Sequence, residues 1–121
     1  MPNDAPVAAL LRAAGGVLLG KANLSEWALI RASYPEAYSS RKGQNRNLYD
    51  LAEDFGGSGS ESANALVANM CAFSIRTETD GSVMFPADRN AVVGIKSTVG
   101  LTSTLGVVPE APSMDTVGIF A

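Results

Sequence analysis

Two short turns, each with a serine beside glycine, contain the residues of this chain best suited to covalent chemistry. The first is Gly56-Gly57-Ser58-Gly59-Ser60, and Ser82 closes the second, Thr77-Glu78-Thr79-Asp80-Gly81-Ser82, 24 residues after Ser58. A nucleophilic serine needs a turn that exposes its hydroxyl, N–H groups that can hold an oxyanion, and a second group that moves the proton. The chain contains no histidine, which excludes a Ser-His-Asp arrangement.

Each motif also has an ordinary structural interpretation. Residues 56–60 have the composition of a flexible linker, although they open directly into a helix-like segment whose free N–H groups could hold a polar partner. Asp80-Gly81 is a common turn pair. Residues 15–21 nearly match a phosphate-binding loop, but Ala22 stands where a hydroxyl should bind Mg²⁺. We therefore do not expect nucleotide binding.

The composition is that of one globular domain. The 121 residues are 46% hydrophobic and 17% charged, with a net charge of −3, so nucleic acid and anionic membranes are not expected partners. The N-terminus lacks a basic segment followed by an apolar one, and the apolar runs are far shorter than a bilayer span. Cys71 is the single cysteine, and we expect it to be a buried, reduced thiol in a cytoplasmic protein.

The apolar periodicity predicts helices alternating with short strands, which is typical of α/β folds. The first helix is expected over residues 6–14, with Asp4 as its N-cap and Gly15-Gly16 at its end. The remaining expectations are helices over 25–31 (capped by Ser25) and 62–70, strands over 17–19, 72–75, 92–95 and 98–102, a polar loop over 32–54, and a turn-rich tail from Pro109 to Ala121.

Four segments together resemble the amidase signature family of serine hydrolases, which cleave carboxamides with a Ser–cis-Ser–Lys triad. Gly20-Lys21-Ala22-Asn23 is similar to the G-K-x-N motif of that family. Residues 56–60 resemble G-G-S-S-G, residues 77–82 resemble G-T-D-x-G-G-S, and residues 93–100 resemble V-G-L-K-P-T-x-G. The resemblance implies a partial amidase-signature fold of the α/β class, with a mixed sheet core flanked by helices and truncated at both ends. We expect residues 1–121 to form a single partial amidase domain.

The resemblance also implies roles for the two serines. Ser82 falls on the nucleophile, and Ser58 falls on the bridging serine, whose preceding Gly57–Ser58 bond is cis in the family. The expected reaction is hydrolysis of a small-molecule amide, without a metal or any other cofactor. The oxyanion hole is expected to consist of backbone N–H groups, those of Thr79, Asp80, Gly81 and Ser82.

The chain departs from the family pattern in its proton relay. The triad lysine of the family lies upstream of G-K-x-N in a Val-Lys-Asp-like strand, so we expect it to be missing from a chain that begins at Met1. Lys21 and Lys96 belong to other motifs. Because the relay is incomplete, the alternative to an amidase with Ser82 as nucleophile is an inactive, amidase-like remnant or binding fragment. The edges of a partial sheet would favour self-association.

Further departures surround the two serines. Gly59 replaces the second serine of G-G-S-S-G. Arg76 replaces the glycine before Thr77, which would bring a long cation to a place built for close backbone approach. Glu61, Glu78 and Asp80 also differ from the family pattern, and Glu78 and Asp80 are expected to add negative charge near the oxyanion. Met84 and Phe85 stand where many relatives have an arginine, which favours a neutral acyl group in the substrate.

Overall fold

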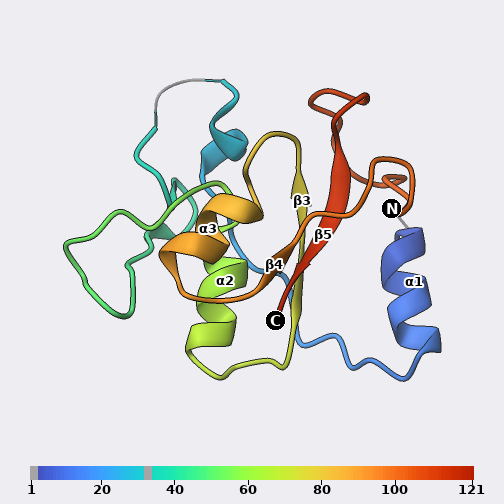
Figure 1. The fold of residues 1–121 in the computed structure, drawn as a ribbon, viewed down its shortest axis with the longest axis horizontal. Helices are drawn as coiled ribbons and strands as arrows, with labels where there is room; N and C mark the ends of the chain where they lie inside the picture. The colour runs from blue at the N-terminus through green and yellow to red at the C-terminus, as the bar shows by residue number, and fades with distance from the viewer. Residues whose placement is uncertain (1–2, 32–33) are drawn as a thin grey trace.

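The computed structural model describes residues 3–31 and 34–121, and Figure 1 shows their arrangement. The regular elements of the described part of the chain are three α-helices, one 3₁₀ helix and five short strands. In chain order they are α1 (Pro6–Ala13), the 3₁₀ helix η1 (Glu26–Leu29), β1 (Tyr38–Ser39), β2 (Gly43–Gln44), α2 (Ser60–Val67), β3 (Ser74–Glu78), α3 (Met84–Arg89), β4 (Gly94–Ile95) and β5 (Thr116–Phe120). The α/β class and the partial amidase-signature fold are confirmed, but the expected mixed sheet is not found, because every strand pair among the described residues is antiparallel.

The main sheet has β5 in its centre. β5 pairs antiparallel with β3 on one side and with β4 on the other, so that Phe120 lies opposite both Ser74 and Gly94. A separate antiparallel pair joins β1 to β2. Figure 1 shows α2 and α3 together on one side of the main sheet and α1 at the opposite edge of the view.

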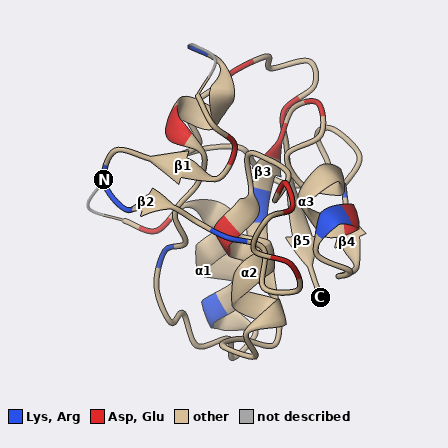
Figure 2. Cartoon of the chain, turned by 90° about the vertical axis from the view of Figure 1, so that its left-hand side faces the viewer, with Lys and Arg blue, Asp and Glu red and all other residues tan. Residues whose placement is uncertain are grey.

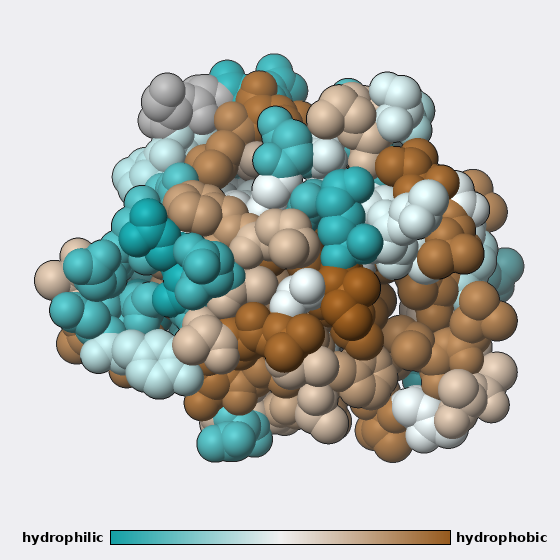
Figure 3. Space-filling view, viewed as in Figure 1, coloured by the Kyte–Doolittle hydropathy of each residue, from teal (hydrophilic) through white to brown (hydrophobic). Residues whose placement is uncertain are grey.

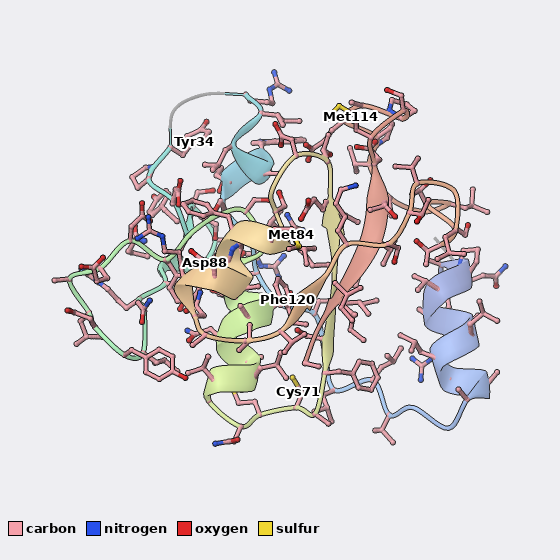
Figure 4. All side chains as sticks on the ribbon, in the orientation of Figure 1. Tyr34, Cys71, Met84, Asp88, Met114 and Phe120 are labelled. Atoms are coloured by element: carbon pink, nitrogen blue, oxygen red, sulfur yellow. The ribbon has the colours of Figure 1, made fainter. Side chains whose placement is uncertain are left out.

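The core lies between α2, α3 and the main sheet. Its buried members are Ala63 of α2, Val83 and Ala87 of the α3 segment, and Phe120 of β5, which Figure 4 shows between the helices and the strands. This small core joins the segment that begins after Ser58 to the segment that begins after Ser82. Packing of the core therefore fixes the two serine turns relative to each other.

Replacing Phe120 by alanine should strongly destabilise the fold. Phe120 is fully buried, and truncation of a buried phenylalanine typically lowers the free energy of unfolding by about 3–5 kcal/mol. Urea unfolding followed by circular dichroism measures this loss. Val17→Ala is the control, because Val17 is 81% exposed and should change the free energy by less than about 0.5 kcal/mol. Equal effects of the two substitutions would contradict this placement of the core.

The first helix is found where it is predicted, but its cap is different. Helix α1 covers Pro6–Ala13 and ends before Gly15, whose φ of +89° suits glycine. The predicted N-cap at Asp4 is wrong, because Ala5 is the N-cap residue and no side chain bonds the helix N-terminus. The carboxylate of Asp4 instead accepts a 2.7 Å hydrogen bond from Arg12 Nε.

Two predicted strands are absent from the described part of the chain. Residues 17–19 have no strand structure, and Val17 and Leu19 are exposed. Residues 98–102 form a turn, in which Leu101 N–H donates to Thr98 O and Gly100 has a φ of +84°. Apolar runs favour strands only when a neighbouring strand supplies the hydrogen-bond ladder, and these two segments have no such partner among the described residues.

Other elements are shifted or were missed. The expected helix over 25–31 is only the 3₁₀ helix η1, and the Ser25 side chain does not cap it. The helix expected over 62–70 begins earlier, at Ser60, and the strand expected over 72–75 continues to Glu78. Strand β5 lies in the tail for which no element is predicted. Cys71 is partly exposed, so the expectation of a buried thiol is wrong.

Charged and apolar side chains are both spread over the surface. Figure 2 shows acidic and basic residues interspersed along the chain. Figure 3 shows apolar residues over the middle and the right-hand side of the visible face. The exposed apolar side chains include Leu19, Val93, Ile95, Leu101 and Leu105. Within the described residues, no helix is long and apolar enough to cross a membrane.

Candidate active site

The structure brings the two serine turns together. Ser58 Oγ lies 2.8 Å from Ser82 Oγ, which is hydrogen-bond distance. Ser58 is buried, whereas Ser82 is only partly buried. The Gly57–Ser58 peptide bond is cis. A hydroxyl pair with one partly exposed member can pass a proton from one oxygen to the other while the exposed oxygen meets a substrate.

Ser25 holds the turn that carries Ser58. Its backbone N–H donates to Ser58 O at 3.1 Å, and its buried hydroxyl accepts a 2.9 Å hydrogen bond from Ala37 N–H. A Cβ atom on Gly57 would lie 3.1 Å from Ser25 Oγ and 3.0 Å from the Leu29 side chain, so a larger residue there would require both side chains to shift. The sequence identifies Ser25 only as a helix cap, because its partners lie 12 and 33 residues away.

Glu61 and Asn23 connect the first two family-like motifs. Asn23 N–H donates to Glu61 Oε2 at 2.7 Å, and Asn23 Nδ2 donates to Ser39 Oγ, also at 2.7 Å. Glu61, a departure from the G-G-S-S-G pattern, thereby fixes the G-K-x-N segment against the N-terminus of α2. The acidic side chain is structural in this chain.

Glu78 holds the turn that carries Ser82. The Glu78 side chain is buried, and its Oε2 accepts hydrogen bonds from Val83 N–H at 2.6 Å and from Met84 N–H at 2.9 Å. The carboxylate thus satisfies two free donors at the start of α3. The Glu78 carboxylate lies next to the residue that follows Ser82 and supports the backbone there, and its effect on an oxyanion stays a prediction.

The predicted oxyanion donors are free to bind a ligand. Within residues 3–31 and 34–121, the backbone N–H groups of Thr79, Asp80, Gly81 and Ser82 donate to no other group of the chain. Gly81 has a φ of +139°, a conformation that strongly favours glycine. Four successive N–H groups without a partner among the described residues, next to the Ser82 hydroxyl, are the kind of array that can hold an oxyanion.

Asp115 fixes the start of this turn through Thr79. Thr79 Oγ1 donates to Asp115 Oδ1 at 2.6 Å, and the N–H groups of Glu110 and Ala111 also donate to the Asp115 carboxylate. The hydrogen bond from Thr79 lowers the pKa of Asp115, and the two backbone N–H groups lower it further. Asp115 directly precedes β5. The hydrogen bond from Thr79 therefore connects the turn of residues 77–82 to the central strand of the main sheet.

We expect Asp115→Asn to lower the free energy of unfolding by about 1–2 kcal/mol at pH 7, because hydrogen bonds to an ionised carboxylate are lost. The pKa of Asp115 is lower in the folded chain than in the unfolded chain. The stabilisation is therefore fully present above the ordinary pKa of an Asp carboxyl, about 4, and it is lost as the pH falls through the folded-state pKa. Urea unfolding at pH 7 and pH 3 tests this. A difference between wild type and variant that stays constant over this range would contradict it.

Arg76 also forms a hydrogen bond with the serine pair. Its Nη2 donates to Ser58 Oγ at 2.6 Å, and Arg76 Nε is buried without a hydrogen-bond partner among the described residues. Burial lowers the pKa of the guanidinium, and the charge of Glu110 partly opposes that shift. The expected entry of a long cation beside the serine turns is therefore confirmed.

Two acidic side chains lie beside the first serine turn. Glu36 approaches Gly57, and burial raises the pKa of Glu36, with a further rise from its hydrogen bond to Asp54. The charge of Arg89 lowers it in part. The Glu36 carboxyl therefore keeps its proton to a higher pH than a carboxyl in water does.

Lys21 and Lys96 lie at the surface, and neither is bonded to the serine pair. No cluster of three or more His, Cys, Asp or Glu residues that could hold a metal ion exists in the described part of the chain. A cavity of about 320 Å³ lies beside Asn23, Trp27 and Arg41, but neither Ser58 nor Ser82 lines it.

The Amidase family profile matches residues 1–121. The chain belongs to the amidase family. A protein of Schizosaccharomyces pombe that carries a provisional name as an amidase is 53% identical over 122 residues, which cover 100% of this chain and 21% of the relative. A glutamyl-tRNA(Gln) amidotransferase chain of Treponema pallidum is 41% identical over 120 residues, 99% of this chain and 23% of the relative. This chain therefore spans about a fifth to a quarter of these amidase-family relatives.

Solved amidase-family structures share the same local fold. The native peptide amidase of Stenotrophomonas maltophilia is 48% identical, with a TM-score of 0.94 over 98% of this chain and 25% of that protein. The peptide amidase PAM bound to the competitive inhibitor chymostatin is 46% identical, with a TM-score of 0.93 over 98% of this chain and 25% of that protein. An amidase family protein of Bacillus anthracis gives a TM-score of 0.94 at 40% identity, over 98% of this chain and 24% of that protein.

Proposed function

We propose that Ser82 is the nucleophile of an amide hydrolysis in which Ser58 relays its proton. The 2.8 Å contact between the two hydroxyl oxygens carries this proposal. Membership of the amidase family supports the reaction class. Residues 1–121 would then contribute the serine pair to a single amidase domain.

The chemistry follows from the positions of the two oxygens. Ser82 Oγ attacks the amide carbon and gives its proton to Ser58, which passes its own proton to a base. The N–H groups of Thr79 to Ser82 hold the oxygen that becomes negative, and one such donor typically lowers the barrier by ~3 kcal/mol. The base, a role that a lysine fills in the family triad, returns this proton through Ser58 to the leaving amine, and water then cleaves the acyl-serine ester to give a carboxylic acid and restore Ser82.

The substrate class is a small carboxamide. A peptide amidase with the same local fold is 46% identical to this chain and binds the inhibitor chymostatin, which supports a peptide-like amide. We propose no metal and no organic cofactor, since the serine pair and backbone N–H groups supply the nucleophile and the oxyanion donors. Action in the cytoplasm stays a prediction from the single cysteine.

A second candidate is an inactive, amidase-like chain. Among the described residues, Ser58 Oγ has two side-chain partners, Ser82 Oγ and Arg76 Nη2. A guanidinium has donors only and cannot accept a proton in a protein. The lack of a base bonded to Ser58 favours this candidate.

A fluorophosphonate probe separates the two candidates. The protein is incubated with the probe at neutral pH, digested, and analysed by mass spectrometry to locate the adduct. We expect one phosphonylated serine, Ser82, and protection by a peptide amide that competes for the site. Absence of any adduct on the folded protein would favour the inactive chain, and an adduct on another serine would reject Ser82 as the nucleophile.

A further inference from the structure

The guanidinium of Arg76 forms no salt bridge within the described residues, and the acidic group whose charge acts on it there is Glu110. The ion pairs of the described residues are Arg12–Asp4 and Arg89–Glu53, and Arg76 is in neither. Its one side-chain hydrogen bond goes to Ser58 Oγ, at 2.6 Å. A partly buried cation without a salt bridge stabilises any negative charge that forms nearby, because the interior screens charges less than water does.

Gly59 makes room for this cation. A Cβ atom on Gly59 would lie 2.8 Å from Arg76 Cγ and 3.2 Å from Arg76 Cδ, and closer still to the carbonyl oxygen of Ser82. A side chain at position 59 would therefore displace the stem of Arg76 as well as the Ser82 backbone. The two departures from the family motifs, glycine at 59 and arginine at 76, fit each other in space.

The guanidinium also occupies one of the two acceptor positions of Ser58 Oγ. Arg76 can only donate, so one lone pair of Ser58 Oγ is held by Arg76 Nη2. The other lone pair and the hydroxyl proton of Ser58 remain for Ser82, 2.8 Å away. Negative charge on Ser82 Oγ would lie across a single hydroxyl group from the cation.

We propose that Arg76 is a positioning residue of the serine pair: seated against Gly59, it holds Ser58 Oγ toward Ser82 and stabilises the negative charge on Ser82 Oγ as its proton leaves. This inference rests on the proposed role of Ser82. Arg76 is not the base, and it acts on Ser82 through Ser58.

The test is the pH dependence of phosphonylation of the full chain. We expect Arg76→Met to move the rising limb of the rate–pH profile to higher pH, which makes labelling at a fixed pH about tenfold slower, as for the loss of a charged hydrogen-bond donor. Arg76→Lys keeps the positive charge and should recover most of the rate. Arg12→Met is the matched control, because Arg12 is exposed and paired with Asp4, and it should leave the profile unchanged.

A double-mutant cycle tests the path through Ser58. If Arg76 acts through Ser58, Arg76→Met should have a much smaller effect in a Ser58→Ala background than in the wild type. Arg76→Gln, which keeps an N–H donor without the charge, gives the same comparison if the methionine variant does not fold, as judged by thermal unfolding.

The outcomes distinguish this inference from the proposed function. Labelling of Ser82 with the same rate and pH profile in wild type and Arg76→Met would overturn the inference and leave Ser82 as the nucleophile. An undiminished effect of Arg76→Met in the Ser58→Ala background would also overturn it. No labelling of folded wild-type protein would reject the proposed function, and the inference with it.

Discussion

Ser82→Ala should abolish phosphonylation and reduce any carboxamide hydrolysis by about four orders of magnitude or more, because no other group can form the acyl intermediate. The variant should keep its free energy of unfolding to within about 1 kcal/mol, since it removes one partly exposed hydroxyl. Labelling rates, initial rates of ammonia or amine release, and urea unfolding measure the three quantities.

Two further substitutions, Ser113→Ala and Ser58→Ala, test whether the loss of labelling is specific to Ser82. Ser113 is exposed in a turn that precedes β5, so Ser113→Ala should label like the wild type. Ser58→Ala should slow labelling without abolishing it, because it leaves the nucleophile in place and removes the relay. Full labelling of Ser82→Ala would reject the assignment of the nucleophile, whatever the other variants show.

The serine pair could be predicted from the sequence because its determinants are local. Each turn is a run of five or six residues rich in glycine and hydroxyl groups, and the segment between Ser58 and Ser82 contains one helix and one strand. When a helix packs against the strand that follows it, the end of the strand lies near the start of the helix. The helix and the strand between the turns therefore bring them to the same end of the unit, where the core that includes Phe120 holds them.

The supports of the pair could not be predicted, because each joins residues distant in the sequence. Strand β5 lies in a segment with many turn residues, and it becomes a strand only because β3 and β4 offer hydrogen bonds on both sides. Asp115 bonds Thr79, 36 residues earlier, and no local pattern indicates that contact. The apolar run over residues 17–19 was wrongly predicted to be a strand, because no adjacent strand pairs with it in the described part of the chain.

The charges near the site were the least predictable part. Glu78 and Asp80 occupy neighbouring positions of one motif, but Glu78 is buried against the N-terminus of α3 and Asp80 is exposed. Arg76 could be identified as a cation that enters the site, but not as a donor to Ser58. Arg76 and Glu78 are two residues apart in β3 and therefore lie on the same face of the strand, so only their hydrogen-bond partners in the folded chain distinguish their roles.

Glu78→Ala should cause a large loss of stability together with a loss of Ser82 reactivity. The substitution removes an acceptor of two hydrogen bonds and leaves the buried N–H of Val83 and the N–H of Met84 unsatisfied. Such losses typically lower the free energy of unfolding by about 2–4 kcal/mol in total. Because these bonds close the turn that carries Ser82, phosphonylation should slow even under conditions in which the variant is folded.

Two further substitutions separate the hydrogen bonds from the charge. Glu78→Gln keeps an acceptor oxygen of nearly the same shape, so it should cost about 1 kcal/mol and retain most of the labelling rate. Asp88→Ala removes a carboxylate from the exposed face of the same helix (Figure 4) and should change stability by less than about 0.5 kcal/mol. If Glu78→Ala were as mild as Asp88→Ala, the Glu78 carboxylate would not hold the turn, and the placement of Ser82 would have to come from the core around Val83 alone.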